Sequence, residues 1–271
     1  VVGDAVGRAA LHAKSAGRFA GRPFADHVFE LLGCSVEWHY PEGYDITEAE
    51  ACTKLVVATV CGPVHKLLLA ERTALNILSR ASGVATAARD ASALVKARGW
   101  HGRVAGTRKT TPGFGIVEKY ALLVGDADTH RMDLSAMVML KDNHIWSTGS
   151  IKGSVERARF ACGFATKIEV ECTSEADARE AIVAGADVVM LDNFAPAERR
   201  EVAARLKAEW PHLLVEASGG ITAATIQSYL TPHVDIISQG ALTNGYATLD
   251  FSLKVPKPEM FAKRQRVEKS S

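Results

Sequence analysis

The chain has 271 residues, which is enough for one large domain or two smaller ones. Hydrophobic residues make up 47% of the sequence and only 9 residues are proline, so a disordered protein is excluded and a sizeable core is expected. The 32 lysines and arginines are balanced by 31 aspartates and glutamates, and no apolar run is long enough to span a membrane. We therefore expect neither a nucleic-acid partner nor a membrane, and any anion must be bound by locally placed charge.

The five cysteines are odd in number and none of them is spaced as C-x-x-C. This pattern is typical of reduced thiols that are buried as small apolar side chains, rather than of a disulfide framework. Together with the lack of a visible targeting segment, it predicts a cytoplasmic protein.

Two segments of the first part of the chain are predicted to be strands of a sheet with one solvated face. Cys34–Tyr40 alternates apolar and polar residues and ends at the turn signal Pro41-Glu42-Gly43. Lys54–Cys61 is rich in valine and threonine and stops at Gly62-Pro63.

Helical spacing of apolar residues follows these strands. It runs from Lys66 to about Arg80 and continues in an alanine-rich style over Ala85–Ala97. Because Ser82-Gly83 separates the two stretches, we expect two helices with a break at that point.

From Trp100 onward, short apolar runs alternate with amphipathic segments. The runs expected to be strands are Val104–Gly106, Ala136–Leu140, Lys167–Val170, Asp187–Leu191, Leu213–Ala217 and Asp235–Ser238. The segments expected to be helices are Ser154–Ala161, Ser174–Ala184, Ala197–Glu209 and Ala223–Tyr229. This alternation is typical of a parallel α/β sheet or barrel, here an incomplete barrel of six or seven strands after a small α+β domain. Leu249–Val255 is expected to return as a strand to the first domain's sheet.

Polar residues follow almost every one of these strands, where barrels of this kind have their active sites. They are Arg108-Lys109, Lys141-Asp142-Asn143-His144, Glu171, Asp192-Asn193, Ser218-Gly219-Gly220 and Gly240, with His130-Arg131 between the first and second strands. A single cation after a strand is usually a solvated loop charge. Their recurrence at successive strand ends predicts a site for a polyanion.

Glu171 and Asp192 end consecutive strands and are expected to lie side by side. Two adjacent carboxylates repel each other, so Mg²⁺ or a cationic centre of the substrate is implied between them. The alternative is that each carboxylate forms a salt bridge with one of the lysines.

Two loops have the composition of an anion-binding loop. Ser218-Gly219-Gly220 opens a helix directly after a strand, where backbone N–H groups favour a phosphate, and Gly240 follows the next strand. In Gly106–Gly113 an arginine and a lysine stand beside three hydroxyls, which suits a fixed cradle for carboxylate and phosphate. The nine histidines show no H-x-H or H-E-x-x-H spacing, so no transition-metal site is expected.

These motifs make the sequence resemble the quinolinate phosphoribosyltransferase family, a type II phosphoribosyltransferase family, in the style of its animal members. The resemblance runs over nearly the whole chain, and the stretch GTRKTTPGF is highly specific to this family and its nicotinate-type relatives. It is carried by Glu71–Asn76, Gly106–Phe114, His130-Arg131, Met139–His144, Glu169–Cys172, Leu191–Phe194, Glu216–Ile221 and Ser238–Thr243.

The resemblance implies an open α/β sandwich over residues 1–87, joined by the C-terminal segment 249–271, and an α/β barrel of about seven strands over 88–248. It implies transfer of the phosphoribosyl group of phosphoribosyl pyrophosphate (PRPP) to quinolinate with loss of CO₂. The products would be nicotinate mononucleotide and pyrophosphate, in de novo NAD biosynthesis. Mg²⁺ is implied with PRPP, and no organic cofactor.

The resemblance also assigns roles to residues. Quinolinate would be bound by Arg72, Thr107, Arg108, His130, Arg131 and Lys141. PRPP and its phosphates would be bound by Lys109, Asn193, Ser218, Gly219, Gly220 and Gly240. The implied catalytic residues are Lys109, Lys141, Glu171 and Asp192, and the last two would also meet Mg²⁺, directly or indirectly. In this family the arginine matching Arg72 reaches into the neighbouring subunit's site, which implies at least a homodimer, and we expect a hexamer built as a trimer of dimers.

Three alternatives remain beside this hypothesis. A related type II phosphoribosyltransferase acting on nicotinate or another monocarboxylate would need fewer cations. A Schiff-base lyase on a sugar phosphate would use Lys109 or Lys141 as nucleophile. A non-catalytic protein that binds a phosphorylated ligand would have no need of the carboxylates Glu171 and Asp192.

Overall fold

The computed structural model describes residues 2, 5–245 and 247–256. The chain forms two compact units. The first consists of the described residues of Val1–Ala87, Ile116–Gly125 and Tyr246–Ser271, and the second of Ala88–Gly115 and Asp126–Gly245. The predicted domain limits, 1–87 and 88–248, stay a prediction, and most of the predicted segment 249–271 lies outside the described residues.

The first unit is built on a four-stranded antiparallel sheet with the order β12-β1-β5-β3. Its strands are β1 (Val6–Ala13), β3 (Ser35–Trp38), β5 (Val56–Pro63) and β12 (Phe251–Lys254). The two predicted early strands correspond to β3 and β5, which pair with each other. The predicted last strand also returns to this sheet, since Leu253 of β12 lies opposite Leu11 of β1. β1 itself has no counterpart among the predicted strands.

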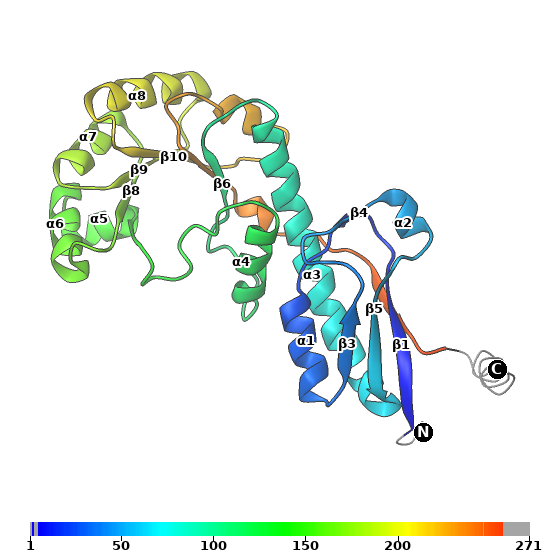
Figure 1. Cartoon of the computed structure of the whole chain (residues 1–271). Coiled ribbons are helices and arrows are strands. Elements are labelled where there is room, and N and C mark those ends of the chain that lie inside the picture. The colour runs from blue at the N-terminus through cyan, green and yellow to red at the C-terminus, as the bar shows by residue number, and fades with distance from the viewer. Residues whose placement is uncertain (1, 3–4, 246, 257–271) are drawn as a thin grey trace, which may run out of the picture. The chain divides into compact units, whose positions relative to one another are not determined.

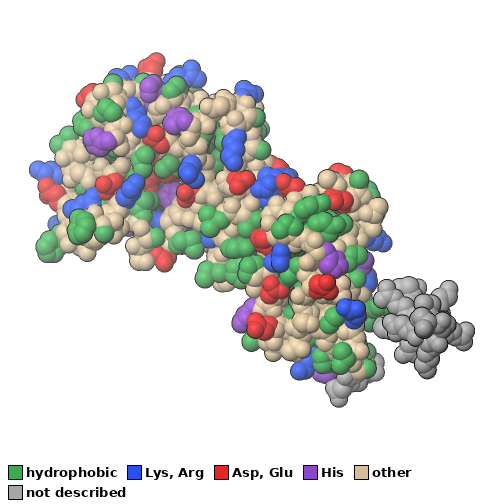
Figure 2. Space-filling view, in the orientation of Figure 1, with side chains coloured by type: hydrophobic (Ala, Val, Ile, Leu, Met, Phe, Trp, Pro, Cys, Tyr) green, Lys and Arg blue, Asp and Glu red, His purple; other side chains and the backbone are tan. Residues whose placement is uncertain are grey.

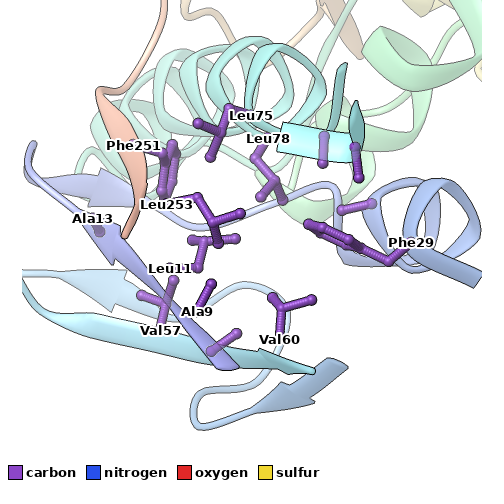
Figure 3. Close-up of a cluster of buried hydrophobic side chains, with 14 of the residues drawn as sticks. Ala9, Leu11, Ala13, Phe29, Val57, Val60, Leu75, Leu78, Phe251 and Leu253 are labelled. Carbon is purple, nitrogen blue, oxygen red and sulfur yellow. The ribbon is translucent and has the colours of Figure 1, made fainter. Parts of the chain in front are cut away.

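Helices cover one face of this sheet. They are α1 (Arg22–Leu31) and the first part of α3 (Val64–Lys96). Most of α4 (Gly115–Val124) belongs to the same unit, and a short α2 (Glu48–Cys52) and a ribbon of β2 (Gly17–Arg18) and β4 (Asp45–Ile46) complete it. Figure 3 shows Leu75 and Leu78 of α3 and Phe29 of α1 facing Leu11 of β1 and Phe251 of β12. Alternate residues of β1 are buried in this core, and each buried leucine contributes roughly 1.5–3 kcal/mol to stability.

The expectation of two helices broken at Ser82-Gly83 is wrong, because α3 runs through that point as one helix of 33 residues. A methyl group at Gly83 would overlap the carbonyl oxygen of Ala247, so the glycine lets another backbone segment pass close to the helix. Ser82 is fully buried, and its hydroxyl accepts from the backbone N–H of Ala20 at 3.0 Å. Both residues therefore serve packing inside the helix, not its termination.

The second unit is a parallel sheet of six strands with the order β6-β11-β10-β9-β8-β7. The strands are β6 (Arg103–Ala105), β7 (Val138–Leu140), β8 (Ile168–Cys172), β9 (Val188–Asp192), β10 (Leu214–Ser218) and β11 (Ile236–Ser238), which confirms all six predicted apolar runs. β6 pairs with β11 on one side, and on its other side Asp128 forms a single parallel bridge with Ala105. The predicted fold class, an α/β protein with an incomplete barrel, is confirmed.

The helices α6 (Ile151–Cys162), α7 (Glu175–Val183) and α8 (Pro196–Glu209) lie along the outer side of this curved sheet (Figure 1), and α5 (Asp142–Thr148) follows β7. Ser174 caps α7, because its hydroxyl accepts the N–H of Asp177 at 3.1 Å. The predicted helix over Ala223–Tyr229 is only a 3₁₀ segment, Ile226–Tyr229. Pro232 disfavours the helical conformation of Thr231, so the segment cannot continue as a longer helix past that point.

Charges of both signs are interspersed on the visible face of the protein, without one gathered basic surface (Figure 2). In the described parts of the chain, no helix combines the length and the apolar character that crossing a membrane requires.

Gly83→Ala is expected to lower the free energy of unfolding by about 1–3 kcal/mol, because the added carbon overlaps a backbone carbonyl and forces a shift. Urea unfolding followed by circular dichroism measures this change. Gly153→Ala in α6 is the matched control, since the atom nearest to its added carbon is the side-chain Oγ of Ser150 at 3.0 Å. Alanine there gains helix propensity but presses on the hydroxyl of Ser150 that caps the helix, so a change of less than about 1 kcal/mol in either direction is expected. Equal effects of the two substitutions would contradict the close approach at Gly83.

Candidate active site at the carboxyl ends of the parallel strands

A cavity of about 760 Å³ opens where the parallel strands of the second unit end. Every predicted site residue except Arg72 lines it, namely Thr107, Arg108, Lys109, His130, Arg131, Lys141, Glu171, Asp192, Asn193, Ser218, Gly219, Gly220 and Gly240. The carboxyl ends of parallel strands meet at one edge of a sheet, which is why residues far apart in sequence share one cavity. Arg72 lies on α3 in the first unit, is exposed, and is absent from the residues lining this cavity.

The loop after β6 is fixed by its own threonine and by the loop after β11. Thr107 Oγ1 accepts the backbone N–H of Lys109 at 3.0 Å, and Thr243 Oγ1 donates to the carbonyl oxygen of Lys109 at 2.8 Å. The stem of Lys109 passes Gly240 so closely that a Cβ added there would lie 3.1 Å from Lys109 Cδ. Arg108 and Lys109 therefore stand on a held backbone at the cavity wall.

The loop after β10 packs tightly against the loop after β9. Gly219 has φ 100°, and a Cβ added to it would lie 2.5 Å from Asn193 Oδ1. Asn193 itself has the left-handed φ of 58°, and its side-chain amide donates to Asp192 Oδ2 at 2.6 Å. Ser238 Oγ donates to Ser218 Oγ at 3.1 Å across neighbouring strands. The two loops thus fix each other, which preorganises N–H and hydroxyl groups for an anion.

A buried arginine, Arg199, contacts both the loop after β9 and, through Tyr229, the loop after β10. Arg199 is 1% exposed, and its Nη1 donates to the carbonyl oxygen of Phe194, next to Asn193. Its guanidinium lies 3.7 Å from the ring centroid of Tyr229, whose hydroxyl donates to the carbonyl oxygen of Gly219 at 3.2 Å. This contact connects both loops to a single buried cation.

The carboxylates at the ends of β8 and β9 are balanced by lysine. Lys141 Nζ forms an ion pair with Glu171, so the predicted salt-bridge alternative is present for this residue. Burial raises the pKa of Asp192, and the negative charge of Glu171 raises it further, while Lys141 and Lys109 oppose the shift. Oxygen donors of this kind are those that Mg²⁺ prefers, and the unfavourable pair of carboxylates is one that such an ion would relieve.

Two arginines, Arg108 and Arg131, line the same cavity, and their positive charges influence each other. Burial lowers the pKa of Arg131, and the positive charge of Arg108 lowers it further, whereas Glu169 opposes the shift. Arg131 Nη2 also lies 3.5 Å from Met139 Sδ. Two cations held close together in a partly buried place favour a bound anion that neutralises both.

His130 also lines the cavity, and its side chain is only 6% exposed. Its Nε2 lies 2.9 Å from Glu216 Oε2 and 3.5 Å from Glu169 Oε2. Both glutamates are essentially buried, and burial followed by the charge of Glu216 raises the pKa of Glu169 well above its ordinary value. Among the described residues, these three form a group whose ligand atoms lie within 4.8 Å of one another.

Sequence reasoning assigned no role to Glu169 and Glu216, because they lie inside strands and not at the strand ends. Each stands between two apolar residues of its strand: Glu169 between Ile168 and Val170 in β8, and Glu216 between Val215 and Ala217 in β10. A carboxylate at a buried position of a strand is rare unless it is paired. A glutamate between apolar strand residues was therefore the feature of the sequence that could have indicated a buried polar group.

Comparison with known proteins agrees with this geometry. The family model "Quinolinate phosphoribosyl transferase, N-terminal domain" matches residues 1–82, and the corresponding C-terminal domain matches residues 84–254. The chain belongs to the quinolinate phosphoribosyl transferase family. The predicted resemblance is therefore confirmed, as is the expectation of an enzyme of the phosphoribosyltransferase class.

Individual members of this family resemble the chain over most of its length. It is 51% identical over 255 residues to the "Nicotinate-nucleotide pyrophosphorylase [carboxylating]" of the rat and also to that of humans, covering 94% of this chain and 84% of each relative. The solved structure of the nicotinate-nucleotide pyrophosphorylase from Francisella tularensis has a TM-score of 0.83 at 30% identity, covering 93% of this chain and 87% of that one.

Gly219→Ala is expected to lower the free energy of unfolding by about 1–3 kcal/mol, because its φ is unfavourable for alanine and its Cβ would collide with Asn193. Gly220→Ala is the matched control, since φ there is 60° and nothing lies within 4 Å of the added carbon. That control should lose about 1 kcal/mol. Urea titration of both variants measures the difference, and a Gly219 variant no less stable than the Gly220 variant would contradict the packing of the two loops.

Proposed function

We propose that the chain transfers the phosphoribosyl group of PRPP to quinolinate, releasing pyrophosphate and CO₂ and forming nicotinate mononucleotide. The observation that carries this proposal is that two arginines, Arg108 and Arg131, line one cavity that also holds the carboxylates Glu171 and Asp192. A dicarboxylate neutralises two guanidinium groups, whereas a monocarboxylate leaves one of them uncompensated. The named activities of the rat and human relatives support the same substrate.

Quinolinate is assigned to the wall formed by Thr107, Arg108 and Arg131, with Lys141 and His130 beside it. Bidentate contacts from arginine would orient the two ring carboxylates and aim the pyridine nitrogen at the sugar. The nitrogen attacks the anomeric carbon of the ribose as the bond to pyrophosphate breaks. The bond between the ring carbon and the adjacent carboxylate then breaks, CO₂ leaves, the electron pair of that bond stays on the ring carbon beside the positive pyridinium nitrogen, and a proton binds there.

The ribose is assigned to the side of the cavity that holds Glu171 and Asp192. Departure of pyrophosphate leaves positive charge on the sugar, and fixed carboxylates nearby stabilise it. Lys109 and Lys141 would stabilise the negative charge of the leaving diphosphate. The 5-phosphate is assigned to the loop containing Ser218, Gly219 and Gly220, with Gly240 and Asn193 beside it.

Mg²⁺ is proposed to accompany PRPP, and Glu171 and Asp192 are the residues that would hold it, directly or through water. When bound, the ion supplies positive charge that stabilises the diphosphate leaving group. The chain's own contribution is to hold two oxygen donors at neighbouring strand ends. No organic cofactor is proposed, because the ring of quinolinate itself accepts the electrons of decarboxylation.

The protein is proposed to act as at least a homodimer, and as a hexamer built from three dimers. Arg72 supports this, since it is exposed on α3 beside the exposed side chains of Leu68 and Leu69 rather than in the cavity. A cytoplasmic location is proposed as well, supported by five cysteines that are all free.

The direct test is an end-point assay with PRPP and Mg²⁺ in which quinolinate and nicotinate are offered in parallel, with nicotinate mononucleotide and CO₂ as readouts. Product and CO₂ from quinolinate alone support the proposal. Turnover of nicotinate alone would favour the monocarboxylate alternative and overturn the dicarboxylate assignment. An adduct trapped by borohydride at Lys109 or Lys141, with no nucleotide formed, would favour the lyase alternative.

Arg108→Ala and Lys109→Ala are each expected to lower kcat/KM by at least about 100-fold, because each removes charge-assisted hydrogen bonds to an anionic substrate. Arg103→Ala is the matched control, since Arg103 is an exposed cation on β6 outside the cavity. Steady-state kinetics with circular dichroism on all three variants checks this. Near-normal turnover of either cavity variant would show that the assignment of the loop after β6 is wrong.

Arg72→Ala is expected to be inactive alone but to regain activity when its subunits are mixed and exchanged with Lys109→Ala subunits. In a mixed dimer one site has both residues intact if Arg72 serves the partner subunit, so a 1:1 mixture should reach about a quarter of the wild-type rate. The control is a mixture of the two variants in which each was cross-linked before mixing, so that subunits cannot exchange between them. Failure of the exchanged mixture to exceed its parents would contradict a shared site.

A further inference from the structure

Both ring nitrogens of His130 are already used within the protein. Nδ1 accepts the backbone N–H of the next residue, Arg131, at 2.8 Å. Nε2 lies 2.9 Å from Glu216 Oε2, and the ring is almost closed off from solvent. A nitrogen that accepts an N–H carries no proton, so Nδ1 is unprotonated and Nε2 bears the hydrogen that it donates to Glu216.

The backbone around His130 is built to hold this arrangement. His130 has the left-handed φ of 56°, which is uncommon for a residue other than glycine. Its backbone N–H donates to Asp128 Oδ1 at 2.7 Å. Asp128 is anchored in turn to β6, because its N–H donates to Val104 and its carbonyl oxygen accepts from Gly106. A left-handed conformation at a residue other than glycine is kept only where contacts from the rest of the protein hold it. Glu216 of β10 adds such a contact through the ring of His130.

The same hydrogen bonds argue against a metal ion among His130, Glu169 and Glu216. A metal on Nε2 requires the lone pair of that nitrogen and leaves the proton on Nδ1. Nδ1 would then face the N–H of Arg131 with a second hydrogen, and two donors repel each other. The group of His130, Glu169 and Glu216 therefore fits a histidine that donates a proton from Nε2 to Glu216, and not a metal ion.

We infer that Glu216 is a positioning residue, which holds His130 as its neutral Nε2–H tautomer so that Nδ1 fixes the backbone of Arg131. His130 then acts through Arg131 and not as a cation that binds a carboxylate of the substrate. The carboxylates of Glu216 and Glu169, from two strands, and the backbone N–H of Arg131 contact the ring, while the carboxylate of Asp128 accepts the backbone N–H of His130. The inference deepens the proposed function and rests on it for the identity of the substrate, since Arg131 is assigned there to quinolinate.

The tautomer is tested on the free protein without substrate. Long-range ¹⁵N–¹H correlation spectra of histidine-labelled protein, with the His130 signals assigned by their loss in His130→Asn, should show a protonated Nε2 and an unprotonated Nδ1 at pH 7. Asparagine is the suitable replacement because it tolerates a left-handed φ. A doubly protonated ring, or a proton on Nδ1, would overturn the inference.

Kinetics of Glu216 variants test the positioning. Glu216→Leu should raise KM for quinolinate about 10- to 100-fold, because a small displacement of a substrate-holding group is costly, while KM for PRPP changes less than about 3-fold. Glu216→Gln should recover most of this loss, since its amide oxygen still accepts from Nε2–H. A glutamine variant as impaired as the leucine variant would show that the charge of Glu216 is needed, and would overturn the inference.

Two controls separate positioning from general damage. Glu118→Leu removes another fully buried carboxylate, paired with Arg80 in the first unit, and should lower stability without changing KM for quinolinate selectively. KM for quinolinate measured between about pH 5 and 8, the range in which histidine usually changes charge, should vary in parallel for wild type and His130→Asn. A wild-type rise in KM with pH that vanishes in the asparagine variant would make His130 a cationic ligand and overturn the inference.

These outcomes are distinct from those of the proposed function. If wild type fails to turn over quinolinate, the proposed function falls, and the tautomer spectrum still decides whether Glu216 holds His130. If Glu216→Leu does not fold, the spectrum and the glutamine variant decide the inference between them. Turnover of quinolinate with normal KM values in a folded Glu216→Leu variant would overturn the positioning role alone.

Discussion

The parallel strands of the second unit bring like charges together at the edge of the sheet where the cavity lies. The rest of the site depends on how these charges are balanced. The sheet order places the ends of β8 and β9 side by side, so Glu171 and Asp192 meet and the pKa of Asp192 rises. Arg108 and Arg131 form a second pair of like charges, which lowers the pKa of Arg131. Each pair is costly in a partly buried cavity and is relieved by a ligand of opposite charge. A substrate set that carries phosphates, two carboxylates and a developing positive centre satisfies both requirements at once.

Rigidity of the loops is the second requirement, since charge stabilises a transition state only where it is held in place. His130 and Asn193, both in left-handed conformations, occur at two strand-end loops of the cavity. Each is fixed by neighbours on other strands, His130 by Glu216 and Asn193 by its contact with Gly219. The buried guanidinium of Arg199 fixes the loops of Asn193 and Gly219 from outside the cavity. The strained backbone of both loops is thus held in place by contacts within the protein.

Helix α3 illustrates how a residue's meaning depends on what packs against it. Gly83 lowers helix propensity, and a glycine beside a serine is a frequent stop signal in sequences. The helix nevertheless continues, because Gly83 leaves room for the backbone at Ala247 and Ser82 bonds to Ala20. Both partners lie more than 60 residues away along the chain, so local pattern could not distinguish a break from a close approach.

The sequence by itself determined the alternation of strands and helices in the second unit, the return of the last strand, and the residues at the strand ends, since these depend on local periodicity and on the rule that parallel strands share an edge. It also determined the family, through contiguous motifs such as Gly106–Phe114. The tertiary structure decided which charges face each other: that Glu169 and Glu216, inside their strands, meet His130, and that both ring nitrogens of His130 are occupied. Periodicity specifies the face of a strand on which a side chain lies, but the partner on the facing strand depends on sheet order and curvature, which are set by packing of the whole unit.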